Sequence, residues 1–234
     1  MAIPKVIHYC WFGRNPKPKL AEKCIASWKK YCPDYEIIEW NEDSFDVNMN
    51  TYTRSAYEQK KYAFLTDYAR LLIIYEHGGV YFDTDVELIK PIDNLLENKA
   101  FFGFENNDHV NTGLGFGAVK GNRIVKLMEE EYDDLHDKEN HFVGCPILNT
   151  NALKKKGLVL NGEEQDLDGS VIYPAEYFNP YDDPTGRLNI TDNTYSIHWF
   201  AKSWMSKKAI IRSFISKPLH RLFGTDFFTK RERK

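Results

Sequence analysis

Apolar residues in the first third of the chain alternate between strand-like and helix-like patterns. Short apolar runs predict strands over residues 6–11 and 35–40, with a helix over residues 20–31 between them. A second, buried helix is predicted up to Gly78, because glycine readily adopts the left-handed conformation found after helices. This alternation is typical of an α/β sheet flanked by helices, in which ligands bind beyond the carboxyl ends of the strands.

The pattern is less regular after Pro91. Residues 101–105 and 114–119 predict further strands, and residues 123–136 predict a helix. The chain shows no internal repeat, and 234 residues with 42% hydrophobic content are enough for one domain with a full core. We therefore expect a single folded domain over residues 1–206.

The most informative segment is GGVYFDTDVELIKPID, residues 78–93. If it continues as a strand beyond the two glycines, Tyr81, Asp83 and Asp85 project to one side, because side chains of a strand alternate in direction. Two converging carboxylates suit a magnesium-type ion, which takes one or two protein carboxylates and completes its shell with water and phosphate oxygens. A D-x-D tripeptide alone is also common at strand ends, where it is simply two solvated acids.

The helix before the glycines carries a second pair of charges. Asp67 and Arg70 are three residues apart and share a helix face. They are either an ordinary surface ion pair, which contributes about 0–1 kcal/mol to stability, or part of a binding site. If the pair holds the donor, replacing Arg70 with alanine is expected to weaken donor binding or turnover and leave the fold intact, whereas unfolding of that variant would favour a structural pair.

The order of these segments resembles glycosyltransferase family 32, whose members carry a sugar-binding D-x-D motif. The resemblance rests first on D-x-x-R in the helix, followed by GGVY and D-x-D. IPKVIHYCWFG resembles the opening strand of the family, and YSIHWFAKSW resembles its closing H-x-W-x-x-S-W element, so the similarity spans residues 3–204. NTGLGFGAVKGN and GCPILNT resemble the segments that line the sugar and acceptor side.

The resemblance implies a GT-A type, Rossmann-like sheet and a retaining, metal-dependent transfer of a hexose from a nucleotide-diphosphate sugar. A UDP-sugar is favoured as the donor, with GDP-mannose as an alternative. The acceptor would be a saccharide or lipid-linked saccharide in bacterial surface polysaccharide synthesis, such as a capsule.

The resemblance also implies a metal site. Asp85 would bind the metal directly, Asp83 would contact the ribose or the water shell of the metal, and His198 would supply another ligand. A histidine favours Mn²⁺ over Mg²⁺, because imidazole suits the later, softer ions. Taken alone, His198 also fits a partly buried structural histidine.

Two groups of functional residues follow from the resemblance. The catalytic group would be Asp83, Asp85 and Arg70. The substrate-binding group would surround the base, ribose, donor sugar and diphosphate, and would comprise Trp11, Phe12, Asp67, Arg70, Tyr81, Asp83, Asn111, Ser203 and Trp204. In this arrangement Trp11 stacks on the base, while Ser203 and Trp204 close over the diphosphate.

Composition points to a protein of the cytoplasm. The four cysteines show neither the C-x-x-C spacing of zinc sites nor the density of a disulfide scaffold, so reduced thiols are expected. No segment approaches the roughly 18 consecutive apolar residues of a membrane span, and Pro4 and Lys5 interrupt any signal-like start. The expected location is the cytoplasm, at the inner face of the plasma membrane if the end of the chain binds lipid.

Residues 207–234 form a distinct basic tail. They hold nine Lys or Arg against two acidic residues, a balance of +7, so the rest of a chain with net charge −3 carries −10. Apolar residues recur at three- and four-residue steps, which predicts an amphipathic helix, or two short helices bent at Pro218. Such a tail either lies on an anionic membrane surface or packs on the domain with its charged face in solvent.

Three other functions would use some of the same features. A metal-dependent phosphatase or nucleotidyltransferase could use D-x-D, but neither a further carboxylate cluster nor a lysine-bearing phosphate loop is evident in the sequence. A noncatalytic module could bind a nucleotide sugar without turnover. A nucleic-acid binder could use the basic tail, but the acidic remainder of the chain opposes this, so no nucleic-acid partner is expected.

Overall fold

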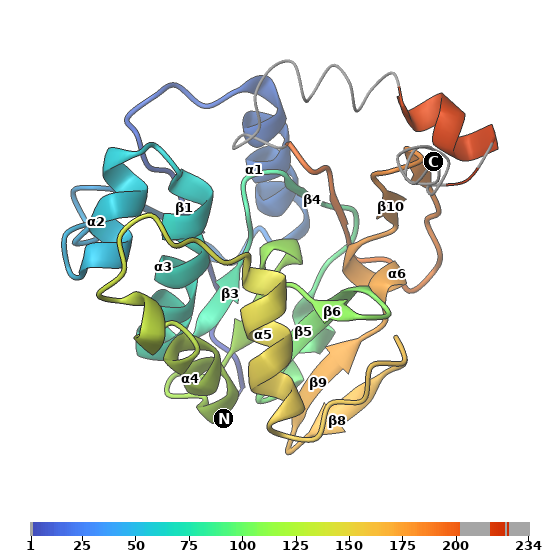
Figure 1. Ribbon diagram of the computed structural model, residues 1–234. Helices are drawn as coiled ribbons and strands as arrows, with labels where there is room; N and C mark the ends of the chain where they lie inside the picture. The colour runs from blue at the N-terminus through green and yellow to red at the C-terminus, as the bar shows by residue number, and fades with distance from the viewer. Residues whose placement is uncertain (1, 202–215, 223, 225–234) are drawn as a thin grey trace, which may run out of the picture.

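The computed structural model describes residues 2–201, 216–222 and 224. Within these residues a mixed sheet of eight strands forms the centre, in the order β2-β1-β3-β7-β5-β9-β8, with β6 paired to β5 (Figure 1). Its strands are β1 (Val6–Cys10), β2 (Glu36–Trp40), β3 (Gly79–Tyr81), β5 (Ala100–Asn106), β6 (His109–Val110), β7 (Phe116–Ala118), β8 (Gln165–Leu167) and β9 (Ser170–Tyr173). β1 is parallel to β2 and β3, whereas β7 is antiparallel to β3 and β5. The predicted α/β sheet is confirmed.

Helices cover both faces of this sheet (Figure 1). Their bounds are α1 (Lys19–Tyr31), α2 (Thr51–Glu58), α3 (Tyr62–His77), α4 (Arg123–Glu130), α5 (Cys145–Lys154) and α6 (Ala175–Phe178), with 3-10 turns η1 (Asp93–Glu97), η2 (Thr112–Leu114) and η3 (Asp133–Leu135). The buried residues form two hydrophobic cores, and strand β5 contributes to both because its side chains alternate in direction. Phe102 and Phe104 face the core shared with α3, α4 and α5, whereas Phe101 faces the core that contains Trp28 of α1.

Several elements agree closely with the sequence-based expectations. The strands predicted over residues 6–11 and 35–40 and the helix over residues 20–31 match β1, β2 and α1 to within one residue. Helix α3 ends where expected, at Gly78, which has a φ of +70°. These elements are local, so apolar periodicity and a single glycine suffice to predict them.

The helix predicted over residues 123–136 is wrong in its second half. Helix α4 ends at Glu130, and the 3-10 turn η3 follows it. Residues 129–134 read EEEYDD, and negative charge at the carboxyl end of a helix is disfavoured by the helix dipole.

The D-x-D segment does not continue β3 as a strand. Strand β3 ends at Tyr81, and the chain turns at residues 84–85. Strand β4 (Val86–Leu88) then leaves the main sheet and pairs antiparallel with β12 (Ser196–His198). The expectation that the two aspartates share one side of a strand is therefore wrong, because a pairing between distant segments places them on a turn.

Two glycines fix the start of this segment against β1. Gly78 and Gly79 both have positive φ, and a Cβ on Gly79 would lie 2.8 Å from the carbonyl oxygen of Val6. His8 of β1 accepts a hydrogen bond from Trp40 Nε1 at Nδ1, so its Nε2 donates to the Gly78 carbonyl at 3.0 Å. Burial lowers the pKa of His8 to about 4, and the imidazole is therefore neutral at pH 7.

Part of the basic tail packs on the folded domain. Residues 216–222 are helical and lie against the hairpin of β10 (Tyr181–Asp182) and β11 (Arg187–Leu188) (Figure 1). Lys217 donates to a tyrosine hydroxyl of β10 at 2.7 Å, and Arg221 donates to two carbonyls of the hairpin turn at 2.5 and 2.6 Å. This short helix thus supports the alternative in which the tail packs on the domain.

The remaining expectations for the tail fall on other residues. The proposed boundary at residue 206 and most of the predicted amphipathic helix lie outside the described residues. Among the helices that the structure does describe, none combines the length and the apolar character needed to cross a bilayer.

Candidate active site

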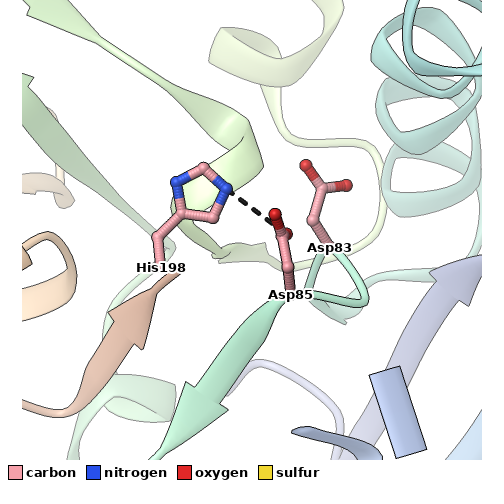
Figure 2. Close-up of side chains that lie close together, drawn as sticks. All are labelled: Asp83, Asp85 and His198. Atoms are coloured by element: carbon pink, nitrogen blue, oxygen red, sulfur yellow. Dashed lines mark ion pairs between the residues drawn. The ribbon is translucent and has the colours of Figure 1, made fainter. Parts of the chain in front are cut away.

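Three metal-ligating side chains from distant parts of the sequence meet beside the turn between β3 and β4. One ligand atom each of Asp83, Asp85 and His198 lies within 4.8 Å of the others. Figure 2 shows the imidazole of His198 facing Asp85, with His198 Nε2 3.3 Å from Asp85 Oδ1 and the carboxylate of Asp83 beside them. The turn supplies the aspartates, and the pairing of β12 with β4 brings in the histidine.

The chain that follows β12 holds Asp85 in place. The backbone N–H of Ala201 donates to Asp85 Oδ2 at 2.8 Å, and the N–H of Trp199 donates to the Asp85 carbonyl at 3.0 Å. The indole of Trp199 also donates to Glu87 Oε2 at 2.8 Å. One Asp85 oxygen is therefore bound by the backbone, and the other faces His198.

A buried arginine holds Asp83 from the opposite side. Arg70 is only 2% exposed, and its Nη1 lies 3.3 Å from Asp83 Oδ2 while its Nη2 bonds Asp67 Oδ1. The hydroxyl of Tyr81 donates to Asp83 Oδ1 at 3.1 Å. The alternative of an ordinary surface ion pair between Asp67 and Arg70 is thus wrong, because the guanidinium is buried between two carboxylates.

Burial and neighbouring charges shift the pKa values of this cluster in different directions. Burial raises the pKa of Asp83 to about 6, although the charge of Arg70 opposes the shift. Burial acts in the same sense on Asp85, but the charge and hydrogen bond of His198 and the N–H of Ala201 together lower its pKa below the ordinary value. For His198 burial favours the neutral form, yet the two carboxylates raise its pKa above 6.5.

These side chains fit a divalent metal ion. Two carboxylate oxygens and an imidazole nitrogen form a mixed donor set of the kind that Mn²⁺ accepts. His198 Nδ1 is also buried without a hydrogen-bond partner among the described residues, so neither ring nitrogen is tied to a neutral group. Two carboxylates held this close together favour a cation between them.

The structure places the predicted base-binding segment at the same edge of the sheet. Trp11 follows β1 and Asp83 follows β3, and these parallel strands end side by side. The indole N–H of Trp11 donates to the Asn15 carbonyl at 2.7 Å, which fixes the ring of this half-buried side chain. Phe12 is only 5% exposed and packs on Phe45 in the core, so its side chain is structural.

The other predicted substrate contacts divide into two groups. Asn111 lies near the metal-ligating cluster, because Gly113, two residues further along the chain, packs against Asp83. A Cβ on Gly113 would lie 2.8 Å from Asp83 Oδ2. Ser203 and Trp204 lie outside the described residues, so their contact with the diphosphate stays a prediction.

Several polar residues around Asn111 had no role assigned to them from the sequence. Glu105 Oε2 accepts from Asn111 Nδ2 at 2.6 Å, and Cys145 Sγ donates to Asn111 Oδ1 at 3.2 Å. Asn149 Oδ1 accepts from both the backbone and the hydroxyl of Thr112, at 3.1 and 2.9 Å. The available signal was polar residues within the apolar segments NTGLGFG and GCPILNT, but a sequence does not show which of them meet.

Residues 18–102 match the family described as "Glycosyltransferase sugar-binding region containing DXD motif". This region of the chain is therefore similar to the DXD-motif glycosyltransferases. The matched segment runs from the start of α1 into β5 and contains Asp67, Arg70, Asp83 and Asp85. His198 lies beyond the matched segment, and the structure brings it beside the two aspartates.

The chain is also similar to parts of longer proteins of known name. Inositol phosphoceramide mannosyltransferase 3 of Schizosaccharomyces pombe is 31% identical over 131 residues, covering 53% of this chain and 35% of the relative. Subversion of eukaryotic traffic protein A of Legionella pneumophila is 24% identical over 247 residues, covering 76% of this chain and 38% of the relative. The chain thus spans little more than a third of the length of these curated relatives.

A solved structure supports the fold. The PaToxG glycosyltransferase aligns with a TM-score of 0.53 at 19% identity, covering 67% of this chain and 70% of that one. The mixed sheet flanked by helices is thus the GT-A type fold expected of DXD-motif glycosyltransferases.

Proposed function

We propose that the protein is a retaining glycosyltransferase that moves a hexose from a nucleotide-diphosphate sugar to a saccharide acceptor. The observation that carries the proposal is the convergence of Asp83, Asp85 and His198 beyond the carboxyl ends of β1 and β3. Both aspartates lie in the segment that matches the DXD-motif family, and His198 lies outside that segment. Asp85 and His198 would bind a divalent ion directly, and Asp83 would complete the site.

The ion, when bound, would supply positive charge that stabilises the departing diphosphate. The protein supplies the geometry. Arg70 and Tyr81 each bond one oxygen of Asp83, and Ala201 bonds one oxygen of Asp85, so both carboxylates are oriented before any ligand arrives. Such preorganisation avoids the cost of reorienting the side chains during the reaction.

The burial of Arg70 changes the role that we assign to it. Both of its guanidinium ends bond carboxylates, and its side chain is almost inaccessible. We propose that Arg70 and Asp67 orient Asp83, and that contact with the ribose and donor sugar falls to more accessible groups such as Trp11.

We propose a front-face transfer, in which the acceptor approaches the face of the sugar from which the diphosphate departs. The bond between the anomeric carbon and the acceptor oxygen forms as the bond to the diphosphate oxygen breaks. The proton of the acceptor hydroxyl passes to the departing diphosphate. This route needs no carboxylate nucleophile at the short distance that retaining glycosidases use.

We propose a UDP-sugar as donor, with GDP-mannose as the second candidate. GDP-mannose is supported by one relative, since the Schizosaccharomyces pombe protein is named as a mannosyltransferase. The imidazole of His198 supports Mn²⁺ over Mg²⁺ as the metal.

We propose a lipid-linked saccharide of bacterial surface polysaccharide synthesis as acceptor, at the cytoplasmic face of the plasma membrane. The basic tail of residues 207–234, with its balance of +7, supports this location. Two of its nine cations, Lys217 and Arg221, bond the β10–β11 hairpin, and the other seven lie outside the described residues.

The proposal is tested by incubating the protein with a panel of UDP- and GDP-sugars and Mn²⁺, and measuring free nucleotide. Release of nucleotide diphosphate together with the sugar is expected for one donor. Release of inorganic phosphate or nucleotide monophosphate would instead identify a phosphatase or nucleotidyltransferase. Donor binding without release, even with saccharide acceptors present, would identify a noncatalytic module.

A further inference from the structure

The side chain of Asn111 has one orientation that its neighbours allow. Its Nδ2 donates to Glu105 Oε2 at 2.6 Å, and its Oδ1 accepts from the Gly113 N–H at 2.7 Å and from Cys145 Sγ at 3.2 Å. A carboxylate only accepts hydrogen bonds and a backbone N–H only donates them. A reversed amide would therefore face both neighbours with the wrong atoms, so Glu105 and Gly113 together determine which way Asn111 points.

Glu105 is well placed to impose this orientation. It lies at the end of β5, and its own carbonyl accepts from Asn179 Nδ2 at 2.9 Å, which holds the backbone. Among the described residues, Glu105 forms no ion pair with a lysine or arginine, and Asn111 is the partner of its carboxylate. The negative charge of Glu105 also helps to raise the pKa of His198, after the larger effects of Asp85 and Asp83.

Asn111 in turn connects to Asp83 through the backbone. Asn111 caps the 3-10 turn η2, and its side-chain carbonyl accepts from the N–H of Gly113. Gly113 packs directly on the site: a Cβ at this position would lie 2.8 Å from Asp83 Oδ2 and 3.0 Å from Arg70 Nη1. Any displacement of the side-chain carbonyl of Asn111 would therefore move the backbone of Gly113, which packs against Asp83 and Arg70.

We propose that Glu105 is a positioning residue of the transfer site, which fixes the amide of Asn111 and, through it, the turn at Gly113 that bounds Asp83. The inference rests on the proposed glycosyltransferase function. It assigns to Glu105 no contact with substrate. The carboxylate acts by accepting from Asn111 and so keeps the side-chain carbonyl of Asn111 directed at Gly113.

Exchanging the two side chains tests this role. In Asn111→Asp a second carboxylate faces Glu105 Oε2, where the amide donor stood 2.6 Å away, and two acceptors repel each other. In Glu105→Gln the new side chain can still accept from Asn111 through its carbonyl. In the double variant the new amide at position 105 donates to one oxygen of the new carboxylate at position 111. The bond is thus restored with donor and acceptor exchanged, and the other carboxylate oxygen still accepts from Gly113.

The expected pattern in the metal-loaded enzyme is a rescue. Asn111→Asp should lower kcat about tenfold or more, Glu105→Gln should lower it about threefold or less, and the double variant should recover most of the activity lost in Asn111→Asp. Mn²⁺ affinity, measured by titration calorimetry, should follow the same order. The exposed Glu97→Gln serves as a matched control and should match the wild type in both measurements.

Each contrary outcome has a distinct meaning. If the wild type releases no nucleotide from any donor, the proposed function fails and this inference fails with it. If the wild type is active but the losses in the two single variants simply add in the double variant, the positioning role alone is wrong. Should Asn111→Asp not fold, the double variant still decides: a folded and active double variant supports the role, and an unfolded or inactive one contradicts it.

Discussion

The carboxyl group of Asp83 must lose its proton before it can serve a metal ion. Burial raises its pKa to about 6, and the pKa of His198 is also raised, above 6.5. Protons and metal therefore compete for the same atoms near neutral pH. We expect Mn²⁺ affinity to fall steeply between about pH 7.5 and 5.5, and Mn²⁺ binding near pH 7 to release protons.

Titration calorimetry in two buffers with different ionisation enthalpies measures both effects. The apparent binding enthalpy should differ between the buffers in proportion to the protons released. Equal Mn²⁺ affinity at both ends of this pH range, with no buffer dependence, would show that these groups do not hold the metal.

Arg70 gives a second residue-scale prediction, which reverses the one made from sequence. Because Arg70 is buried between Asp67 and Asp83, Arg70→Ala leaves the buried Asp67 and the partly buried Asp83 without their cation. Breaking a buried ion pair in this way costs about 3–5 kcal/mol of stability. Thermal and urea unfolding of Arg70→Ala should show this loss, with exposed Arg54→Ala as the control. A loss below about 1 kcal/mol would indicate that the pair is effectively solvated.

At the scale of elements, β1 is joined to the D-x-D segment by His8. The pKa of His8 is about 4 in the folded protein and about 6.5 when unfolded, so the unfolded chain binds more protons between these values. The stabilisation is complete above about pH 6.5 and is lost as the pH falls toward 4. The expected loss from about pH 7 to pH 5 is about 2 kcal/mol.

Urea unfolding of the wild type and of His8→Gln at these two pH values isolates the effect. The variant cannot titrate at this position, so its stability should fall less over the same interval. If both proteins lose the same stability, groups other than His8 account for the pH dependence.

Elements were predictable where their signals are local. Strand β1, strand β2 and helix α1 follow from apolar spacing, and the end of α3 follows from Gly78. The turn that carries the D-x-D motif was not predictable, because it depends on the pairing of β4 with β12, which lies far along the chain. The motif was recognised correctly, although the geometry first assigned to it was wrong.

At the scale of the whole molecule, the site combines the ends of β1 and β3 in the main sheet with the separate pair of β4 and β12. The resemblance to a known family supplied Asp83, Asp85 and His198, and the structure confirms that they meet. It assigned no role to Glu105 or Gly113, whose importance comes from contacts across the fold rather than from their own chemistry.

The basic tail gives a prediction at the same scale. If residues 207–234 bind an anionic membrane, the full-length protein should cosediment with anionic vesicles at low salt, and a chain truncated after residue 206 should not. Each basic side chain near such a surface contributes about 1 kcal/mol, and salt weakens the attraction. Neutral vesicles provide the control. A full-length protein that ignores anionic vesicles at low salt would show that the tail serves the domain alone.

The central claim is that the D-x-D turn and His198 form a metal-dependent transfer site. Its most direct test is nucleotide release from the active donor, with Mn²⁺ or with chelator, for wild type, Asp85→Ala and the exposed control Asp137→Ala. We expect chelator to abolish release in the wild type and control, Mn²⁺ to restore it, and Asp85→Ala to remain at least about a hundredfold slower, as for loss of a group that stabilises transition-state charge. Full activity in chelator, or near wild-type turnover in Asp85→Ala, would contradict the claim.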